Sequence, residues 1–259
     1  MSAHVPSLRL IIRGDDAGAT RGSNEALLAC ARAGLVRNVG FMACAPAFDH
    51  AAQLFREPPP GVVLGLHATV TSEWNSSLRW GPVLPRDQVP SLLAADGNFV
   101  HTTKTLYEQA DHNQIIDEVR AQIRKARRAG LRIAYLDTHM AFTWIPGMQA
   151  RINDLALEEG LVPDQAGANG IHQRLPKAKV TSADPAEEFR RRVEAASPGN
   201  YVAVFHPSLL DDDALLMRAA DSDDPASIGR QRAAEAALLT ESSTGVWLRD
   251  RGVVSIVYS

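Results

Sequence analysis

Cysteine is scarce in this sequence, since the 259 residues include only Cys30 and Cys44. The two are not spaced as metal ligands usually are, and one of them falls within a helical pattern. We therefore expect two small buried thiols with no role in metal binding.

An excess of charge of one sign is also missing. The formal net charge is -3, the isoelectric point is near 6.2, and no long basic block occurs. These features argue against nucleic acid or an anionic membrane as a partner. No apolar run approaches the length of a membrane span, and the first ten residues lack the apolar stretch of a secretory signal. The sequence predicts a cytoplasmic protein.

Two common catalytic motifs are absent as well. Gly14, Gly18 and Gly22 are spaced four apart and are interrupted by two acids, which would repel a phosphate. No serine lies in a nucleophile-elbow pattern, so a Ser/His/Asp triad is unsupported.

The composition that is present, 45% apolar and 22% charged residues, is typical of a globular protein. Strand-like and helix-like segments alternate along the chain. We expect strands near 8–13, 36–43, 62–66, 133–136, 201–205 and 253–258, with helices over 23–34, 47–55, 112–129, 146–159 and 225–239, from 184 onward and near 244. Ser23 or Asn24 would cap the first helix. This alternation predicts one α/β domain over residues 1–259, with a parallel sheet that is closed or nearly closed as a barrel.

One long segment, residues 69–106, has no clear periodicity. It contains several prolines and two tryptophans, and it starts directly after His67. Long loops inside compact domains are usually functional or disordered. We interpret this segment as a lid or a substrate wall.

Four of the apolar strand-like runs, 8–13, 62–66, 133–136 and 201–205, share one property: each is followed by a carboxylate or an imidazole. The residues at these ends are Asp15 and Asp16, His67, Asp137 and His139, and His206. Buried parallel strands are rich in Val, Ile and Leu, and in α/β folds the chemistry gathers at their carboxyl ends. We therefore expect these side chains to meet over one substrate.

Asp15 and Asp16 are adjacent acids in a glycine-flanked turn, where packing does not explain them. One of them could bind a metal while the other removes a proton from the attacking water. The alternative is a helix-capping or turn pair, because aspartate favours both positions.

His67 and His139 occupy similar places after strand-like runs. A single histidine there is more often structural than a ligand, but one carboxylate with two imidazoles suits zinc or a similar divalent ion that keeps open positions. Asp137 would either orient a ligand histidine or stabilise the turn.

His206 precedes Pro207 at another strand end. It could protonate a leaving group in amide or ester hydrolysis, and the alternative is a turn histidine. Trp74, Trp80 and Trp144 follow the other two histidines, where they would either form platforms for a sugar ring or pack in the core.

Longer blocks of the sequence resemble the YdjC family of carbohydrate deacetylases, the ChbG/HpnK type. The blocks are IIRGDDAGATRGSNEAL with ARAGLVRNVGFMACAPAF, VVLGLHATVT, SLLAADGNF, LRIAYLDTHMAF and VFHPS. The resemblance implies a distorted (β/α) barrel similar to a TIM barrel. It also implies that Asp16, His67 and His139 are metal ligands, that Asp15 is the base, and that His206 is a candidate acid.

Two positions depart from the family pattern. Asp164 stands where many members have an arginine, and Ala141 stands where some have a further histidine. Both positions fall near where substrate groups would lie, so the identity of the substrate does not follow from the resemblance.

Together these features predict a metal-dependent hydrolase that removes acetyl groups from N-acetylated sugars or oligosaccharides, with zinc or magnesium as the expected ion. One rival is a metal hydrolase of another amide or ester. A second rival is a non-catalytic sugar-binding protein on the same barrel, although the presence of both Asp15 and Asp16 argues against it. A homodimer is suggested only by analogy with the family.

Overall fold

Strand β1 (Leu8–Ala17) lies at the centre of a parallel sheet. It pairs with β2 (Asn38–Phe41) on one side, with β7 (Gly199–Phe205) on the other, and with the short β8 (Val254–Ile256) near the C-terminus. The apolar residues of β1 from Leu10 onward are buried, as expected for a strand that is covered on both faces.

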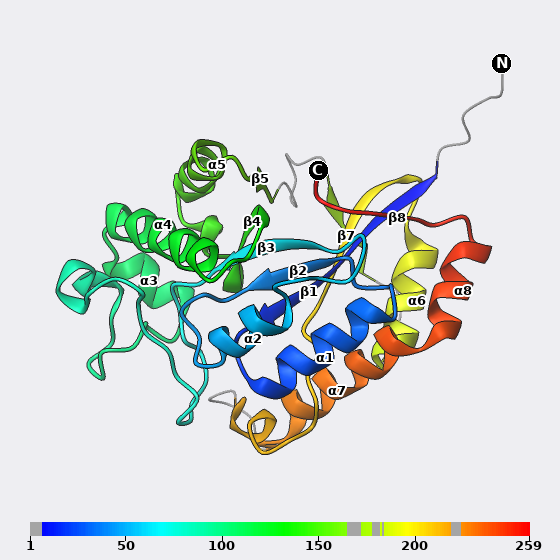
Figure 1. Ribbon diagram of the computed structural model, residues 1–259, viewed down its shortest axis with the longest axis horizontal. Coiled ribbons are helices and arrows are strands. Elements are labelled where there is room, and N and C mark those ends of the chain that lie inside the picture. Colours follow the sequence, from blue (N-terminus) through cyan, green and yellow to red (C-terminus); the bar gives the residue numbers. More distant parts are fainter. Residues whose placement is uncertain (1–6, 165–171, 178–181, 183, 219–223) are drawn as a thin grey trace.

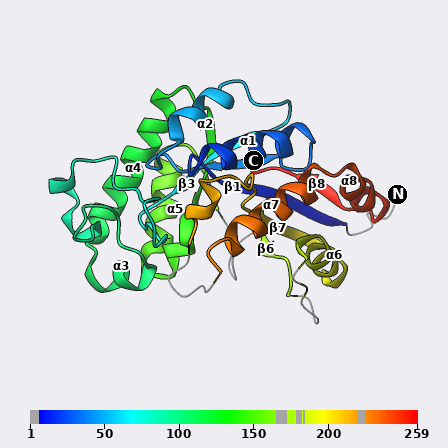
Figure 2. The same cartoon turned by 90° about the horizontal axis from the view of Figure 1, so that it is seen from below.

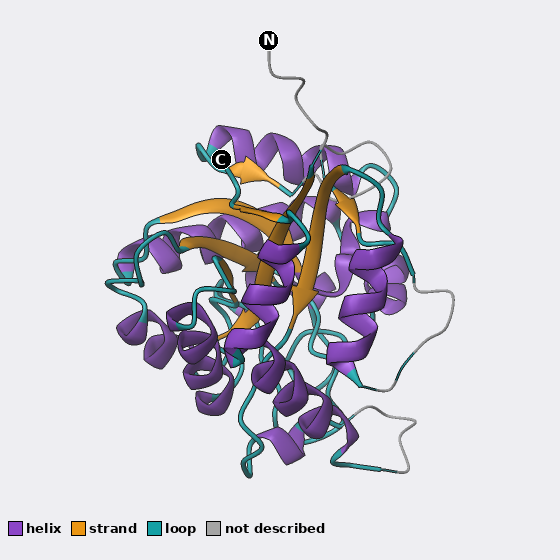
Figure 3. Ribbon diagram, turned by 90° about the vertical axis from the view of Figure 1, so that its right-hand side faces the viewer, coloured by secondary structure: helices purple, strands orange, loops and turns teal. Residues whose placement is uncertain are grey.

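The computed structural model describes residues 7–164, 172–177, 182, 184–218 and 224–259. Across these residues the strand order is β5-β4-β3-β2-β1-β7-β6, with β8 added to β1. The strands not yet introduced are β3 (Val63–Ala68), β4 (Ile133–Thr138), β5 (Val162–Pro163) and β6 (Gln173–Arg174). Within the described ranges β5 and β6 do not pair, so the sheet is a curved half-barrel (Figure 3). The predicted α/β fold, a distorted barrel in one domain, is confirmed.

Helices cover the outside of this sheet (Figures 1 and 2). The helices are α1 (Arg21–Arg32), α2 (Phe48–Leu54), α3 (Thr103–Gln109), α4 (His112–Arg128), α5 (Met148–Glu158), α6 (Pro185–Ala195), α7 (Ser227–Thr240) and α8 (Ser242–Asp250). Helix α1 packs against β1, α2 and α7, and α4 packs against β3 and α5. Nowhere in the described ranges is a helix both long and apolar enough to cross a membrane.

The cap of the first helix lies three residues before Ser23, the first of its two predicted caps. Thr20 is the cap, and its hydroxyl accepts a hydrogen bond from the backbone N–H of Ser23 at 3.0 Å. The prediction of Ser23 or Asn24 was wrong because Asn24 has another role: its side-chain oxygen accepts from the backbone N–H of Gly18 at 2.6 Å. Asn24 thereby fixes the turn that follows the two acids of β1.

Residues 69–106 form a packed unit. They contain the short 3-10 helices η1 (Arg86–Gln88) and η2 (Pro90–Leu92) and the first residues of α3, which the sequence did not predict. Trp80 and Phe99 are among the buried side chains of this unit. Helix α4 anchors it, since the carboxylate of Glu118 accepts from the backbone N–H groups of Val83 at 2.9 Å and Leu84 at 3.0 Å.

Candidate metal centre and active site

An irregularity near the end of β1 allows its two acids to face one site. Neighbouring residues of a regular strand point to opposite faces. Here the pairing of β1 with β2 shifts between Gly14 and Ala17, and Asp16 has a φ of 66°, a left-handed conformation that aspartate tolerates. As a result Asp15 Oδ2 lies 3.8 Å from His67 Nδ1, and Asp16 Oδ1 lies 3.5 Å from His67 Nε2.

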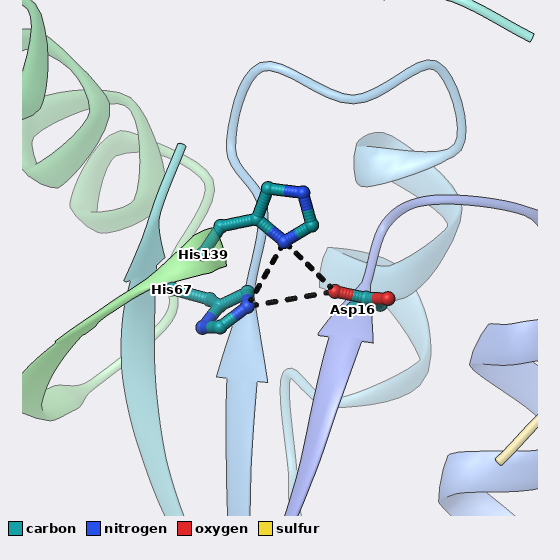
Figure 4. Close-up of side chains that lie close together, drawn as sticks. All are labelled: Asp16, His67 and His139. Carbon is teal, nitrogen blue, oxygen red and sulfur yellow. Dashed lines mark hydrogen bonds and ion pairs between the residues drawn. The ribbon is translucent and has the colours of Figure 1, made fainter. Parts of the chain in front are cut away.

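Three ligand atoms form a nearly equilateral triangle. Asp16 Oδ1 lies 3.5 Å from His67 Nε2 and 3.4 Å from His139 Nδ1, and the two histidine nitrogens are 3.3 Å apart. Figure 4 shows the three side chains pointing toward one another from the carboxyl ends of β1, β3 and β4. Ligands about 2.1 Å from a tetrahedral zinc ion lie about 3.4 Å apart, so the spacing fits one ion.

The environment of this triangle also suits a cation. Asp16, His67 and His139 are all buried. In the described part of the chain, Asp16 Oδ1 has no hydrogen-bond partner, although buried polar atoms nearly always have one. The site therefore presents an oxygen and two nitrogens that a divalent ion would satisfy.

Each histidine is held by a carboxylate on its other nitrogen. His67 Nδ1 lies 2.7 Å from Asp137 Oδ2, and His139 Nε2 lies 2.9 Å from Glu73 Oε2. Metal-ligating histidines usually donate this second N–H to a carboxylate, which fixes the ring and the tautomer. Asp137 makes the contact expected of a residue that orients a ligand.

Sequence reasoning missed Glu73. It lies in the segment after β3 that lacks periodicity, so nothing in its immediate neighbourhood marked it. The one available signal was that Glu73 is the only acid between His67 and Asp87.

A second group of possible ligands, formed by Asp15, His67 and Asp137, already has a cation beside it. Arg13 is 2% exposed, its Nε lies 2.9 Å from Asp15 Oδ1, and its Nη2 lies 2.8 Å from Asp137 Oδ2. The guanidinium group thus neutralises these carboxylates. The Asp16 triangle is consequently the better place for a metal.

Arg232 of α7 approaches Asp16 from the other side. Its Nη1 lies 2.8 Å from Asp16 Oδ2, the oxygen that points away from the triangle. This ion pair leaves Asp16 Oδ1 directed at the two histidines. Like Arg13, Arg232 was missed from the sequence, because no local pattern connects either arginine with the acids of β1.

Charge governs the protonation of this cluster. Burial alone would raise the pKa of Asp16, but Arg232 and His139 hold it well below its usual range. Burial likewise opposes protonation of His139, yet Glu73 and Asp16 raise the pKa of His139 to about 10. The pKa of His67 is also raised, against burial, by Asp137 and Asp15. In the metal-free protein His139 therefore carries a proton at neutral pH that a metal would displace.

His206 lies beside this cluster but does not contact it directly. It follows β7 and is half-buried, and its backbone N–H donates to Glu235 Oε2 at 2.6 Å. Within the described residues its ring makes no hydrogen bond to the other predicted site residues. Burial lowers the pKa of His206, and the imidazole lines a cavity of about 520 Å³ beside Phe205 and Phe189.

The three tryptophans of interest have different surroundings. Trp80 is buried with its ring edge-on to His139 at a centroid distance of 6.1 Å, and Trp74 is buried with Arg232 over its face. Trp144, by contrast, is 52% exposed. It is the last residue of the short helix η3 (His139–Trp144).

The structure also shows where the two departures from the family pattern, Ala141 and Asp164, are located. Ala141 and Met140 both have positive φ values, 49° and 53°, directly after His139. Asp164 Oδ2 lies 3.2 Å from Arg13 Nη1, so the acid at this position pairs with an arginine supplied by β1.

Comparison with solved structures places the fold among known ones. A protein of Enterococcus faecalis V583, provisionally assigned to cellobiose-phosphate cleavage, superimposes with a TM-score of 0.79 at 20% identity, over 97% of this chain and 98% of that one. A CE4 esterase of Streptococcus mutans gives a TM-score of 0.50 at 16% identity, over 97% of this chain and 86% of that one. At these identities the likeness shows the fold alone.

Comparison with curated proteins finds relatives of similar length. A carbohydrate deacetylase of Geobacillus stearothermophilus is 27% identical over 96% of both chains. One from Brevibacillus brevis is 24% identical over 97% of this chain and 99% of its own. The sequence model of the family described as YdjC-like protein matches residues 9–250. With this match over nearly its whole length, the chain belongs to the YdjC-like protein family.

Proposed function

We propose that this protein is a metal-dependent hydrolase that removes acetyl groups from N-acetylated sugars or oligosaccharides. The observation that carries the proposal is the triangle of Asp16 Oδ1, His67 Nε2 and His139 Nδ1, with sides of 3.3 to 3.5 Å. The sugar substrate is supported by the full-length relatives, which are described as carbohydrate deacetylases.

Asp16, His67 and His139 would hold the ion. A divalent ion bound there supplies Lewis-acid polarisation of the acetamide carbonyl and makes water more acidic. The protein supplies the remaining groups, which lie on different strands of the sheet.

Asp15 is suited to take the proton of the attacking water. Its carboxylate is buried beside His67, and its Oδ1 lies 2.9 Å from Arg13 Nε. Arg13 also donates two hydrogen bonds to Oδ2, of 3.1 and 2.9 Å, so the whole carboxylate is held in a fixed position. A base must lie within hydrogen-bond reach of the proton it removes, and a fixed carboxylate meets that need.

His206 would protonate the departing amine. Because burial lowers its pKa, its protonated form is a stronger acid than an exposed imidazolium.

Residues 69–106 would form a wall of the site. This segment supplies Glu73 to His139 and places Trp80 against the same ring. Its anchoring by Glu118 supports a fixed wall that excludes water, in preference to a mobile lid. The cytoplasmic location and the homodimer suggested by the sequence stay predictions.

The test is a metal analysis of the purified protein followed by an acetate-release assay. We expect about one equivalent of a divalent ion, and acetate release from N-acetylated sugars that a chelator stops and added zinc restores. A panel of simple amides and esters separates this function from the first rival. A protein whose sugar affinity ignores chelators, and which releases no acetate, would instead be a binding protein.

A further inference from the structure

Arg13 and Asp15 share one face of β1 with Ile11, because alternate residues of a strand point the same way. On this face lies a small apolar cluster, separate from the main core, made of Ile11, Tyr135, Val202 and Tyr258. Arg13 lies between that cluster and Asp15. A contact that fixes Arg13 on the side of the cluster therefore also affects Asp15 on its other side.

The C-terminal segment reaches this cluster through its pairing with β1. In the parallel register, Arg9 pairs with Val254 and Ile11 with Ile256. Two residues further along both chains, the same register brings Tyr258 beside Arg13. Figure 1 shows this segment, in red, running along the sheet to the C-terminus.

Tyr258 is fixed by four contacts, made by its ring, its backbone and its hydroxyl. It is 3% exposed, and its ring stacks on that of Tyr135 with centroids 4.3 Å apart and an interplanar angle of 23°. Its backbone N–H donates to Asn38 Oδ1 at 3.1 Å. Its hydroxyl accepts from Arg13 Nη1 at 2.9 Å and donates to Asp164 Oδ1 at 3.0 Å.

The two edges of the Arg13 guanidinium group face different partners. Nη1 contacts the Tyr258 hydroxyl and Asp164 Oδ2, the latter at 3.2 Å. The opposite edge, Nε and Nη2, holds Asp15, and Nη2 also lies 2.8 Å from Asp137. Because the guanidinium group is planar and rigid, fixing one edge fixes the other.

From this geometry we propose that Tyr258, with Asp164, is a positioning residue that sets the orientation of Asp15 through Arg13. The hydroxyl gives Arg13 a neutral partner on the side away from the catalytic acids. Without it, Nη1 would have Asp164 as its one remaining partner among the described residues, and the guanidinium group could tilt toward that carboxylate. The base would then leave its productive position while the metal triangle stayed intact.

The inference rests on the proposed function for its kinetic part. In Tyr258→Phe the ring and its stacking remain and only the hydroxyl is lost. We expect kcat for acetate release to fall roughly tenfold to a hundredfold, as for a catalytic group misplaced by about 1 Å. The KM and the bound metal stay as in the wild type.

Tyr135→Phe is the matched control. It removes a hydroxyl from the other ring of the same stacked pair, and among the described residues that hydroxyl has no hydrogen-bond partner. We expect this variant to keep the wild-type kcat. Asp164→Asn is a second test, because Asp164 lies near the surface and the change preserves the shape of its side chain. It should lower kcat in the same direction.

A second measurement does not depend on activity. The Nε–H resonance of Arg13, assigned by its loss in Arg13→Lys, reports the position of the guanidinium group. We expect Tyr258→Phe to shift this resonance and to speed its exchange with solvent, and Tyr135→Phe to leave it in place. An unmoved resonance in Tyr258→Phe would overturn the inference, and so would wild-type kcat in that variant. If the wild type releases no acetate at all, the proposed function fails and the resonance alone decides the role of Tyr258.

Discussion

Asp16 and Arg232 form an ion pair that uses one side of the carboxylate only. Arg232 Nη1 lies 2.8 Å from Asp16 Oδ2, while Oδ1 stays buried without a hydrogen-bond partner in the described part of the chain. The arginine thus neutralises part of the acid's charge and at the same time aims the other oxygen at His67 and His139. This arrangement suits a ligand that must be ionised and directed before a metal arrives.

His67→Ala should abolish both stoichiometric metal binding and acetate release, because it removes one corner of the ligand triangle. Metal content by mass spectrometry and the acetate assay check this prediction. His112→Ala, at the start of α4 and away from the site, is the control and should behave as the wild type. A His67→Ala protein with full turnover would remove His67 from the site.

Asp15→Asn and Asp16→Asn should have different effects although the residues are neighbours. Asp16→Asn weakens metal binding, because it removes the charge of a ligand. Asp15→Asn should retain the metal and lose a factor of roughly 10² to 10⁴ in kcat, the usual contribution of a general base. Parallel metal titrations and kinetics separate the two roles. Equal loss of metal in both variants would contradict the assignment of Asp15 as base.

Metal binding near neutral pH should release protons. The pKa of His139 is raised to about 10, so its ligand nitrogen loses a proton only when a metal binds or when the pH rises toward that value. Metal affinity should therefore increase with pH through the neutral range. Calorimetry in buffers of different ionisation enthalpy measures the protons released. In Glu73→Gln, which removes a negative charge beside His139, fewer should be released.

The same raised pKa makes a prediction about the metal-free protein. Protonated His139 is stabilised by Glu73 and Asp16 only in the folded state. This contribution to stability is fully present below the unfolded pKa of about 6.5, and it is lost as the pH rises toward 10. Thermal unfolding of the chelated protein should show this decline. A matching series on Glu73→Gln should show a weaker one.

Gly40→Ala should lower kcat by more than its effect on the stability of the fold would explain. A Cβ at this position of β2 would lie 2.8 Å from Asp15 Oδ1 and 3.2 Å from His67 Cβ. Asp15 or His67 would have to move, so under the proposed function we expect kcat to fall at least tenfold. Gly245→Ala in α8, where the nearest atom is the end of the Arg249 side chain at 3.4 Å, is the control. Unchanged kcat in Gly40→Ala would show that Asp15 has room to move without loss of function.

Much of the fold and part of the site follow from local sequence. The apolar run before Asp15 predicts a buried strand because that property depends on neighbouring residues, and the same holds for the runs before His67 and His139. The central residues of α4 follow from an apolar period that its own sequence carries. The carboxyl ends of parallel strands meet at one edge of the sheet, so the triangle of Asp16, His67 and His139 was also predictable.

The partners of those residues were decided by tertiary structure. Glu73 lies in an aperiodic segment, Arg232 in a helix late in the chain, and Tyr258 one residue from the C-terminus, so no local pattern connects them with the acids of β1. The left-handed backbone of Asp16 likewise arises from a register shift between two strands. The sequence by itself determined which groups we propose for the chemistry. Their orientation and protonation depend on contacts between residues far apart in the chain, because only folding brings those charges together in a buried site.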